Sequence, residues 1–210
     1  MRRLDFTLLT DGSSDAVLVH PLTWLLEQNL QHLSVAVIGT WADLRRLPTP
    51  PKDLAGRVAA ALDLYPCDIL FVHRDAEAMP FDQRVDEIDN AVAQIANPHV
   101  PVVPIRMQEA WLLFDEPALR RAAGNPSGRV NLQMPAVNQL ESIPDPKQLL
   151  HALLLEAGEL TGRRRKKQRP SQQALRLGEI IQDYGVLRQL AAFRRTEERL
   201  LAILEGDLDY

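Results

Sequence analysis

The feature that most constrains the fold is a set of four short apolar segments, each separated from the next by a stretch long enough to form a helix. The apolar segments are residues 6–10, 34–38, 68–73 and 100–105, and helix-like patterns follow at 17–26, 54–64, 82–96 and from Gln108. Strands that alternate with helices of this length form right-handed βαβ units, which give a mostly parallel sheet buried on both faces. The sequence therefore predicts an α/β fold with a mostly parallel four-stranded sheet.

Local signals set several expected boundaries within this pattern. Ser13 or Ser14 is expected to cap the first helix, and Asp53 is expected to cap the helix at 54–64, which Pro66 then stops. Gly39 is expected to end the second strand.

The pattern changes in the last third of the chain. Residues 125–146 contain four prolines and predict an irregular connection. Helical patterns return at 147–157, 171–183 and 187–204, with a charged break at 162–170. We therefore expect an α/β domain over residues 1–126, followed over 127–210 by the irregular connection and a helical C-terminal subdomain.

Acidic residues follow three of the four apolar segments. They form the motif Asp11-Gly-Ser-Ser-Asp15, the motif Asp75-Ala-Glu77, and Glu109. Residues just past the ends of parallel strands share one edge of the sheet, where such folds bind ligands. Carboxylates gathered there repel one another unless a cation or proton lies between them, and oxygen ligands suit Mg²⁺ or Mn²⁺. The pattern thus predicts a metal site at this edge.

The expected roles differ among these residues. Asp75 and Glu77, two apart at a strand end, give the strongest signal for metal ligands and catalytic groups, and Asp11 is expected to join them. Asp15, Glu109 and Ser13 are expected in an outer shell. Structural interpretations stay open: Asp11 and Ser13 equally suit helix capping, and Asp15 and Glu109 suit the first turns of helices.

Basic residues supply candidate phosphate contacts on a chain whose formal net charge is −4. Because the overall charge is acidic, contact with DNA or RNA would need a local patch. The candidates are Arg74 and Arg106 near the acidic motifs, and the run Arg163, Arg164, Arg165, Lys166 and Lys167. A solvated loop between helices is an equally good interpretation of the run.

Other features bear on location and assembly. The single cysteine, Cys67, excludes an internal disulfide and suits a reducing compartment. No apolar stretch is long enough to span a membrane, and no signal-peptide core is present, so the expectation is a cytoplasmic protein without a membrane partner. Leucines on the C-terminal helices would suit a homodimer if they are exposed.

The acidic motifs, in this order, resemble those of TOPRIM-like proteins, and among them the family called domain of unknown function 4276. The matching motifs are the loop Asp11–Asp15, the pair Asp75 and Glu77, and a Pro-containing strand end that leads to Glu109-Ala-Trp-Leu-Leu. The resemblance continues through Glu-Ser-Ile-Pro-Asp-Pro-Lys at 141–147 and the helical tail, so it spans most of the chain. It implies a TOPRIM or Rossmann-like fold.

The resemblance also implies an activity. TOPRIM domains use Mg²⁺ held by such carboxylates to cut, join or prime nucleic acid, which implies a hydrolase or transferase acting on phosphodiesters. Here Asp11 replaces the family's usual Glu, and Glu77 replaces its usual Asp. Moving the proton-transfer group back by one methylene can be costly in rate.

The alternative is therefore a catalytically inactive regulatory or binding protein, for example the partner of a defence-type ATPase. A receiver-like phosphoacceptor centred on Asp75 ranks last, because strand four leads into Arg106-Met-Gln and no fifth strand with a following lysine is evident.

Overall fold

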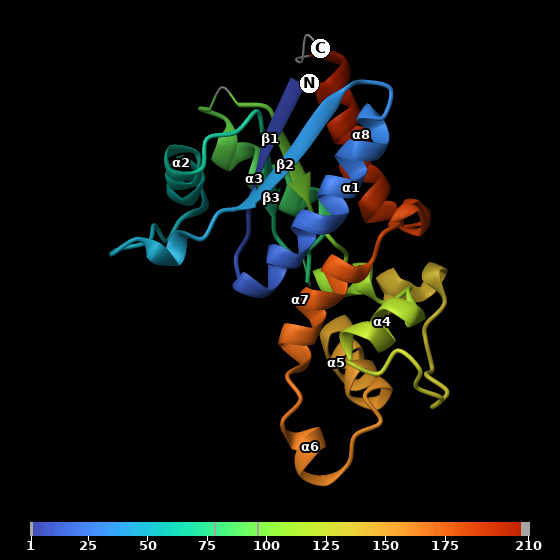
Figure 1. Cartoon of the computed structure of the whole chain (residues 1–210). Helices are drawn as coiled ribbons and strands as arrows, with labels where there is room; N and C mark the ends of the chain where they lie inside the picture. The colour runs from blue at the N-terminus through green and yellow to red at the C-terminus, as the bar shows by residue number, and fades with distance from the viewer. Residues whose placement is uncertain (1, 78, 96, 207–210) are drawn as a thin grey trace.

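The computed structural model describes residues 2–77, 79–95 and 97–206 and has an α/β fold with a four-stranded sheet. All three strand pairings are parallel, as predicted, in the order β2-β1-β3-β4. The strands are β1 (Arg2–Leu9), β2 (Val35–Trp41), β3 (Ile69–His73) and β4 (His99–Val102). They run from the top of Figure 1 toward the helices drawn below the sheet.

Helices connect the strands and then fill the last third of the chain (Figure 1). The α-helices are α1 (Val19–Leu30), α2 (Leu54–Leu64), α3 (Phe81–Val92), α4 (Glu116–Ala122), α5 (Pro146–Ala157), α6 (Gly162–Lys166), α7 (Pro170–Ile180) and α8 (Ala191–Gly206). Short 3-10 helices are η1 (Ser13–Leu18), η2 (Leu44–Arg46), η3 (Gln108–Leu112), η4 (Val137–Ser142) and η5 (Gly185–Gln189). None of the helices described is long and apolar enough to cross a lipid bilayer.

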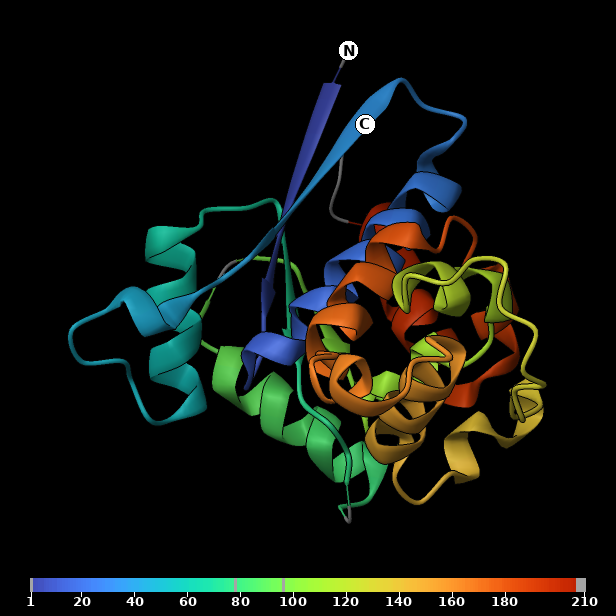
Figure 2. The same cartoon turned by 60° about the horizontal axis from the view of Figure 1, so that its bottom comes forward.

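Side-chain alternation along the strands builds one hydrophobic core on each face of the sheet. On one face, Phe71 of β3 joins a large cluster with α1 and the C-terminal helices. On the other, Val72 joins a smaller cluster with Val58 of α2 and Ile88 of α3. In Figure 2 the teal and green helices lie on one side of the strands, and the blue, orange and red helices lie on the other. The C-terminal helices therefore share the larger core with the sheet.

Several predicted boundaries are confirmed and others are wrong. The Asp53 side chain accepts a hydrogen bond from Gly56 N at 2.8 Å, and α2 ends at Leu64 before Pro66. No serine caps the first helix; instead the Asp15 carboxylate accepts from Gly12 N at 2.9 Å. The helix predicted over 82–96 ends at Val92, and its predicted last residue, Ala96, lies outside the described residues.

Gly39 does not end β2, which runs on to Trp41. Phe6, the residue that pairs with Gly39 across the strands, lies so close that a Cβ on Gly39 would be 2.3 Å from the Phe6 ring. The glycine therefore leaves space for an aromatic side chain in the larger core instead of breaking the strand.

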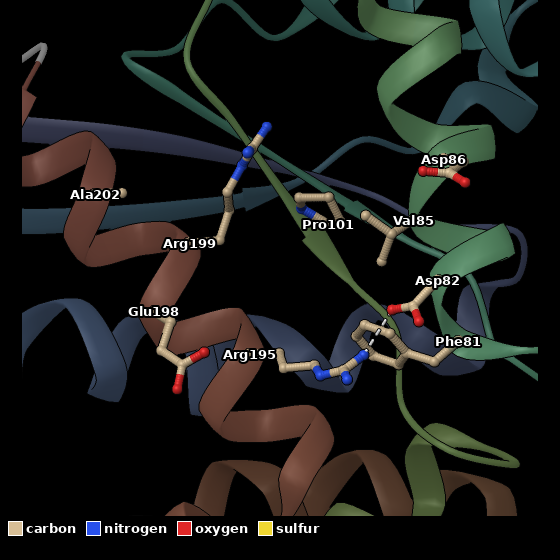
Figure 3. Close-up of a pocket in the computed structure, with 9 residues that line it drawn as sticks. All are labelled: Phe81, Asp82, Val85, Asp86, Pro101, Arg195, Glu198, Arg199 and Ala202. Carbon is tan, nitrogen blue, oxygen red and sulfur yellow. Dashed lines mark hydrogen bonds and ion pairs between the residues drawn. The ribbon is translucent and has the colours of Figure 1, made fainter.

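The free edge of β4 lies in a hollow of about 430 Å³ between α3 and α8 (Figure 3). The backbone N–H groups of Leu70 in β3 and of Arg74 just after it donate to the carbonyls of Pro98 and Val102, so the backbone of Pro101 faces away from β3. Proline has no N–H group to offer a further strand, which is a common protection of exposed edges. An ion pair of 2.8 Å between Arg195 of α8 and Asp82 of α3 also spans this edge.

The close approach at Gly39 yields a stability prediction. Gly39→Ala is expected to destabilise the fold by about 1–3 kcal/mol, because the added methyl group overlaps the Phe6 ring. Urea unfolding measures the change. Phe6→Leu in the same chain should reduce the cost of Gly39→Ala, and Gly206→Ala, where a Cβ meets open space, is the control. Equal stability of Gly39→Ala and the wild type would contradict the proposed packing.

Candidate functional site

The place where the chain leaves β1 and β3 is the position at which a parallel α/β sheet binds its ligands, and we refer to it as the crevice. These neighbouring strands pair through Leu9 and Val72 near their carboxyl ends. The chain leaves β1 toward α1 on one face and leaves β3 toward α3 on the other face. Diverging connections of this kind open the crevice in which parallel α/β sheets bind ligands. Three of the predicted site motifs border it.

The alternation of β3 continues past its end and separates the residues that follow. His73 and Asp75 lie on the side of the large core, and Arg74 points to the opposite side, where it pairs with Glu87 of α3. The strand thus directs one carboxyl group and one imidazole toward α1 and η3, and directs the neighbouring guanidinium group away from them.

Asp75 is the most perturbed acid of this site. Burial, followed by the charges of Asp15 and Glu109, raises its pKa to about 8. A backbone hydrogen bond from Gln108 offsets part of the shift, and Glu77 adds to it. Oδ1 of Asp75 is buried and accepts no hydrogen bond from any described residue. A buried oxygen without a partner is costly, so this group favours a proton or a ligand.

His73 presents a ring nitrogen to this same oxygen. Its Nδ1 lies 2.9 Å from the carbonyl oxygen of Val102, which can only accept, so Nδ1 carries the hydrogen. Nε2 lies 3.5 Å from Asp75 Oδ1. Complete burial lowers the pKa of His73, and the pKa of Asp75 is raised, so the two are not an ion pair at neutral pH. A neutral imidazole therefore faces a protonated carboxyl group.

Asp15, expected in an outer shell, lies among the charges that act directly on Asp75. Its carboxylate is almost fully buried and accepts hydrogen bonds from Gly12 N at 2.9 Å, Ser14 Oγ at 2.9 Å and Gln108 Nε2 at 3.2 Å. The bond from Gln108 joins η3 to η1, and the other two bonds lie within the first loop and η1. Asp15 thus closes the first loop and contributes negative charge to the site.

Glu109, also expected in an outer shell, is buried at the start of η3. Its Oε1 lies 3.5 Å from Nζ of Lys147 on α5. The helical part of the chain therefore supplies a cation to the acidic side of the crevice, and this contact partly neutralises Glu109.

Asp11 has a different environment from the other acids. Arg57 of α2 and Arg74 both pair with its carboxylate, and Arg57 also donates to the carbonyl oxygen of Thr10. Although burial acts in the opposite direction, these two guanidinium groups hold the pKa of Asp11 below its ordinary value. Asp11 is thus an ionised carboxylate with two cationic partners, and its predicted role in metal binding stays a prediction.

Glu77 and Arg106 lie in adjoining loops and both have strained backbones. Their φ angles are 51° and 72°, in the left-handed region, and Glu77 N donates to Arg106 O. Glu159 shares this conformation, but its side chain accepts hydrogen bonds from two backbone N–H groups. The side chains of Glu77 and Arg106 form no hydrogen bond or ion pair with a described residue. Strained backbone whose side chains have no such contact is found at functional loops.

The remaining predicted residues are placed in two other regions. Ser13 lines a hollow on the β2 side of the first loop. Arg163, Arg164, Arg165, Lys166 and Lys167 are all exposed in and just after α6, at the far tip of the helical part in Figure 1. The structure therefore does not place the basic run among the acidic residues of the crevice.

The structure thus brings Asp15, Asp75 and Glu109 together with Glu77 at their margin, and it pairs Asp11 with arginines. Across residues 2–77, 79–95 and 97–206, no group of three or more histidine, cysteine, aspartate or glutamate residues is placed to hold a metal ion. The carboxylates would have to move closer together to share a cation.

Sequence reasoning did not identify Arg57 and Lys147 as parts of the site. Arg57 reaches Asp11 from the first turns of α2, and Lys147 reaches Glu109 from α5. Neither belongs to a recognisable motif, because each is brought to the crevice only by packing of its helix.

Searches against protein-family models, curated proteins and solved structures find no match to this chain.

The raised pKa of Asp75 predicts how stability depends on pH in the presence of EDTA. The folded state keeps the Asp75 proton up to about pH 8, whereas the unfolded chain loses it near its ordinary value. Between these values the folded state binds more protons, so the contribution of Asp75 to stability falls as pH rises, by up to about 1.4 kcal/mol per pH unit.

Asp75→Asn removes this contribution. The free energy of unfolding of Asp75→Asn relative to the wild type is therefore expected to increase from pH 5.5 to 8.5, by up to about 3 kcal/mol. Urea unfolding at each pH gives the difference. Asp63→Asn, at an exposed position on α2, should differ from the wild type by a constant amount. A constant difference for Asp75→Asn as well would show that Asp75 ionises normally.

Proposed function

We propose that this protein is a divalent-cation-dependent hydrolase or transferase that acts on phosphodiester bonds of nucleic acid. The observation that carries the proposal is the carboxyl group of Asp75. Its Oδ1 is buried and has no hydrogen-bond partner among the described residues, and it lies beside the charges of Asp15 and Glu109. Carboxylates that repel one another in a crevice at the end of a parallel sheet are stabilised when a cation enters.

The donor chemistry supports a hard cation. Asp75, Asp15 and Glu77 offer only carboxylate oxygens as ligands. The buried Oδ1 of Asp75 has no hydrogen-bond partner among the described residues and can therefore bind a cation. Mg²⁺ or Mn²⁺ held there would polarise a phosphate oxygen and lower the pKa of a bound water. On the opposite side of the strand, Arg74 and Arg57 already bind one anion, the Asp11 carboxylate. Guanidinium groups in this position could form charge-assisted hydrogen bonds with the negatively charged oxygens of a phosphodiester.

The basic run of α6 supports nucleic acid as the substrate class. Residues 163–167 are exposed, and none of these five side chains forms an ion pair with a described residue. A cluster of unpaired cations on a chain with net charge −4 concentrates positive potential at one tip. Such a tip can hold a phosphate backbone while another part of the strand lies at the crevice.

The proposal predicts metal-dependent cleavage that requires Asp75. With the metal removed by EDTA and Mg²⁺ or Mn²⁺ then restored, the wild type is expected to bind the metal in calorimetry and to cleave labelled DNA or RNA. Asp75→Asn is expected to lose metal binding and to lower the cleavage rate at least about 100-fold. Gel electrophoresis of single- and double-stranded DNA and RNA measures the rate.

Two controls accompany this experiment. Asp63→Asn removes one carboxylate far from the crevice and should retain wild-type activity. Asp15→Asn should weaken metal binding, but it also replaces one of the two oxygens that accept from Gly12, Ser14 and Gln108 by an NH2 group, so its unfolding curve is measured alongside. Absence of metal binding by the wild type would refute the proposal.

The basic run predicts a salt-dependent affinity for nucleic acid. Replacing Arg163, Arg164 and Arg165 by Gln is expected to weaken binding to a short DNA duplex in fluorescence anisotropy. The slope of log affinity against log salt should become shallower by about 0.9 for each phosphate that the variant no longer neutralises.

The matched control removes three exposed arginines that lie elsewhere, Arg121, Arg129 and Arg194. Its affinity should stay closer to that of the wild type. Equal effects of the two triple variants would mean that binding follows net charge and not the α6 tip.

A second candidate function is supported by the environment of Asp11. Two arginines pair with this carboxylate, and the described residues contain no preformed group of three metal ligands. A carboxylate held by two guanidinium groups is a poor proton-transfer group. A catalytically inactive protein that binds a partner is consistent with both observations, and metal binding without cleavage in the experiment above would support it.

A further inference from the structure

A second hollow, of about 280 Å³, lies at the carboxyl ends of β1 and β2. Its walls are residues 10–13 of the first loop, residues 41–45 after β2, and residues 50–52 together with Arg57. Arg57 forms part of this hollow and also pairs with Asp11, which Arg74 binds from the side of β3. The hollow therefore adjoins the crevice through the Asp11 ion pairs.

The charges of this hollow favour an anion. Arg45, Lys52 and Arg57 line it, against the two carboxylates of Asp11 and Asp43. Both carboxylates already have guanidinium partners: Arg57 and Arg74 for Asp11, and Arg45 at 2.7 Å with Arg46 at 3.7 Å for Asp43. Lys52 is exposed and forms no ion pair with another residue of the described chain. A further negative charge would be attracted to it.

An aromatic ring forms part of the same wall. The Nε1–H of Trp41 donates to Thr10 Oγ1 at 2.9 Å, which fixes the orientation of the indole. The guanidinium carbon of Arg45 lies 5.0 Å from the ring centroid, and the Arg45 side chain is 64% exposed. An exposed arginine on an indole can move aside or stack on a second planar group. Nucleic-acid bases bind such surfaces by stacking.

We propose that this hollow binds one nucleotide, with its phosphate at Lys52 and Arg57 and its base on Trp41. The hydroxyl group of Ser13, which also lines the hollow, is a further donor for the phosphate. This inference rests on the proposed function, because it places one nucleotide of the substrate strand beside the phosphodiester that reaches the acidic crevice. It adds a binding site that does not include Asp15, Asp75 or Glu109 and needs no metal.

Tryptophan fluorescence tests the inference. Trp24 and Trp111 are buried, at 9% and 1% exposure, so a ligand in the hollow acts on the signal of Trp41. The full chain in EDTA and a phosphate-free buffer is titrated with adenosine monophosphate, inorganic phosphate, adenosine and a short single-stranded oligonucleotide. We expect saturable quenching by adenosine monophosphate and by the oligonucleotide, and weaker binding of phosphate or adenosine alone.

Variants identify the residues that bind the ligand. Lys52→Gln is expected to weaken adenosine monophosphate binding about tenfold, the effect of losing one charge-assisted hydrogen bond. Arg121→Gln is the matched control, because Arg121 is exposed on α4 and does not line the hollow. Trp41→Phe should remove the fluorescence signal, and calorimetry then reports the residual affinity.

Two outcomes would overturn the inference. Phosphate that binds as tightly as adenosine monophosphate would exclude a contribution from Trp41. Equal weakening by Lys52→Gln and Arg121→Gln would show attraction to surface charge and not a site. The titration contains EDTA, so it does not depend on the proposed metal site. If the protein binds adenosine monophosphate in EDTA but cleaves no nucleic acid with Mg²⁺ or Mn²⁺, this inference is supported and the proposed activity is not.

Discussion

The alternation of side chains at the end of β3 is the constraint on which the site depends. It directs His73 and Asp75 to one face of the sheet and Arg74 to the other. If the register shifted by one residue, Arg74 would neutralise the acidic side, and Asp75 would meet the arginines that now bind Asp11. The separation of charge across one strand therefore leaves the buried carboxyl group of Asp75 without a lysine or arginine partner in the described parts of the chain, while the opposite side holds paired guanidinium groups.

The acidic crevice is maintained at a cost that other contacts offset. Burial of Asp75 opposes its ionisation, and the backbones of Glu77 and Arg106 are strained. The opposing contacts are local: Asp15 bonds the first loop to η3 through Gln108, and Lys147 reaches Glu109 from α5. The helical C-terminal part thus stabilises the crevice directly as well as covering one face of the sheet, because it shares the large core and supplies this cation.

Sequence patterns were sufficient for the strands, and insufficient for the partners of the acidic residues. Apolar runs and the cap at Asp53 depend on local chemistry, so the parallel sheet and the start of α2 could be predicted. The role of Gly39 inside β2 could not be predicted, because it depends on the ring of Phe6 on the neighbouring strand. Likewise, the difference between Asp11 and Asp15 is set by Arg57, Arg74 and Gln108, which packing brings from three other parts of the chain.

The shielded edge of β4 has a consequence for how copies of this chain could join. Pro101 and the ion pair between Arg195 and Asp82 obstruct strand addition there, whereas β2, at the other edge, is only partly buried along its length. A sheet with a single open edge can pair with one equivalent edge, and the pair then has no edge left to extend. Joining through the sheets would therefore stop at two copies and could not propagate into a fibre.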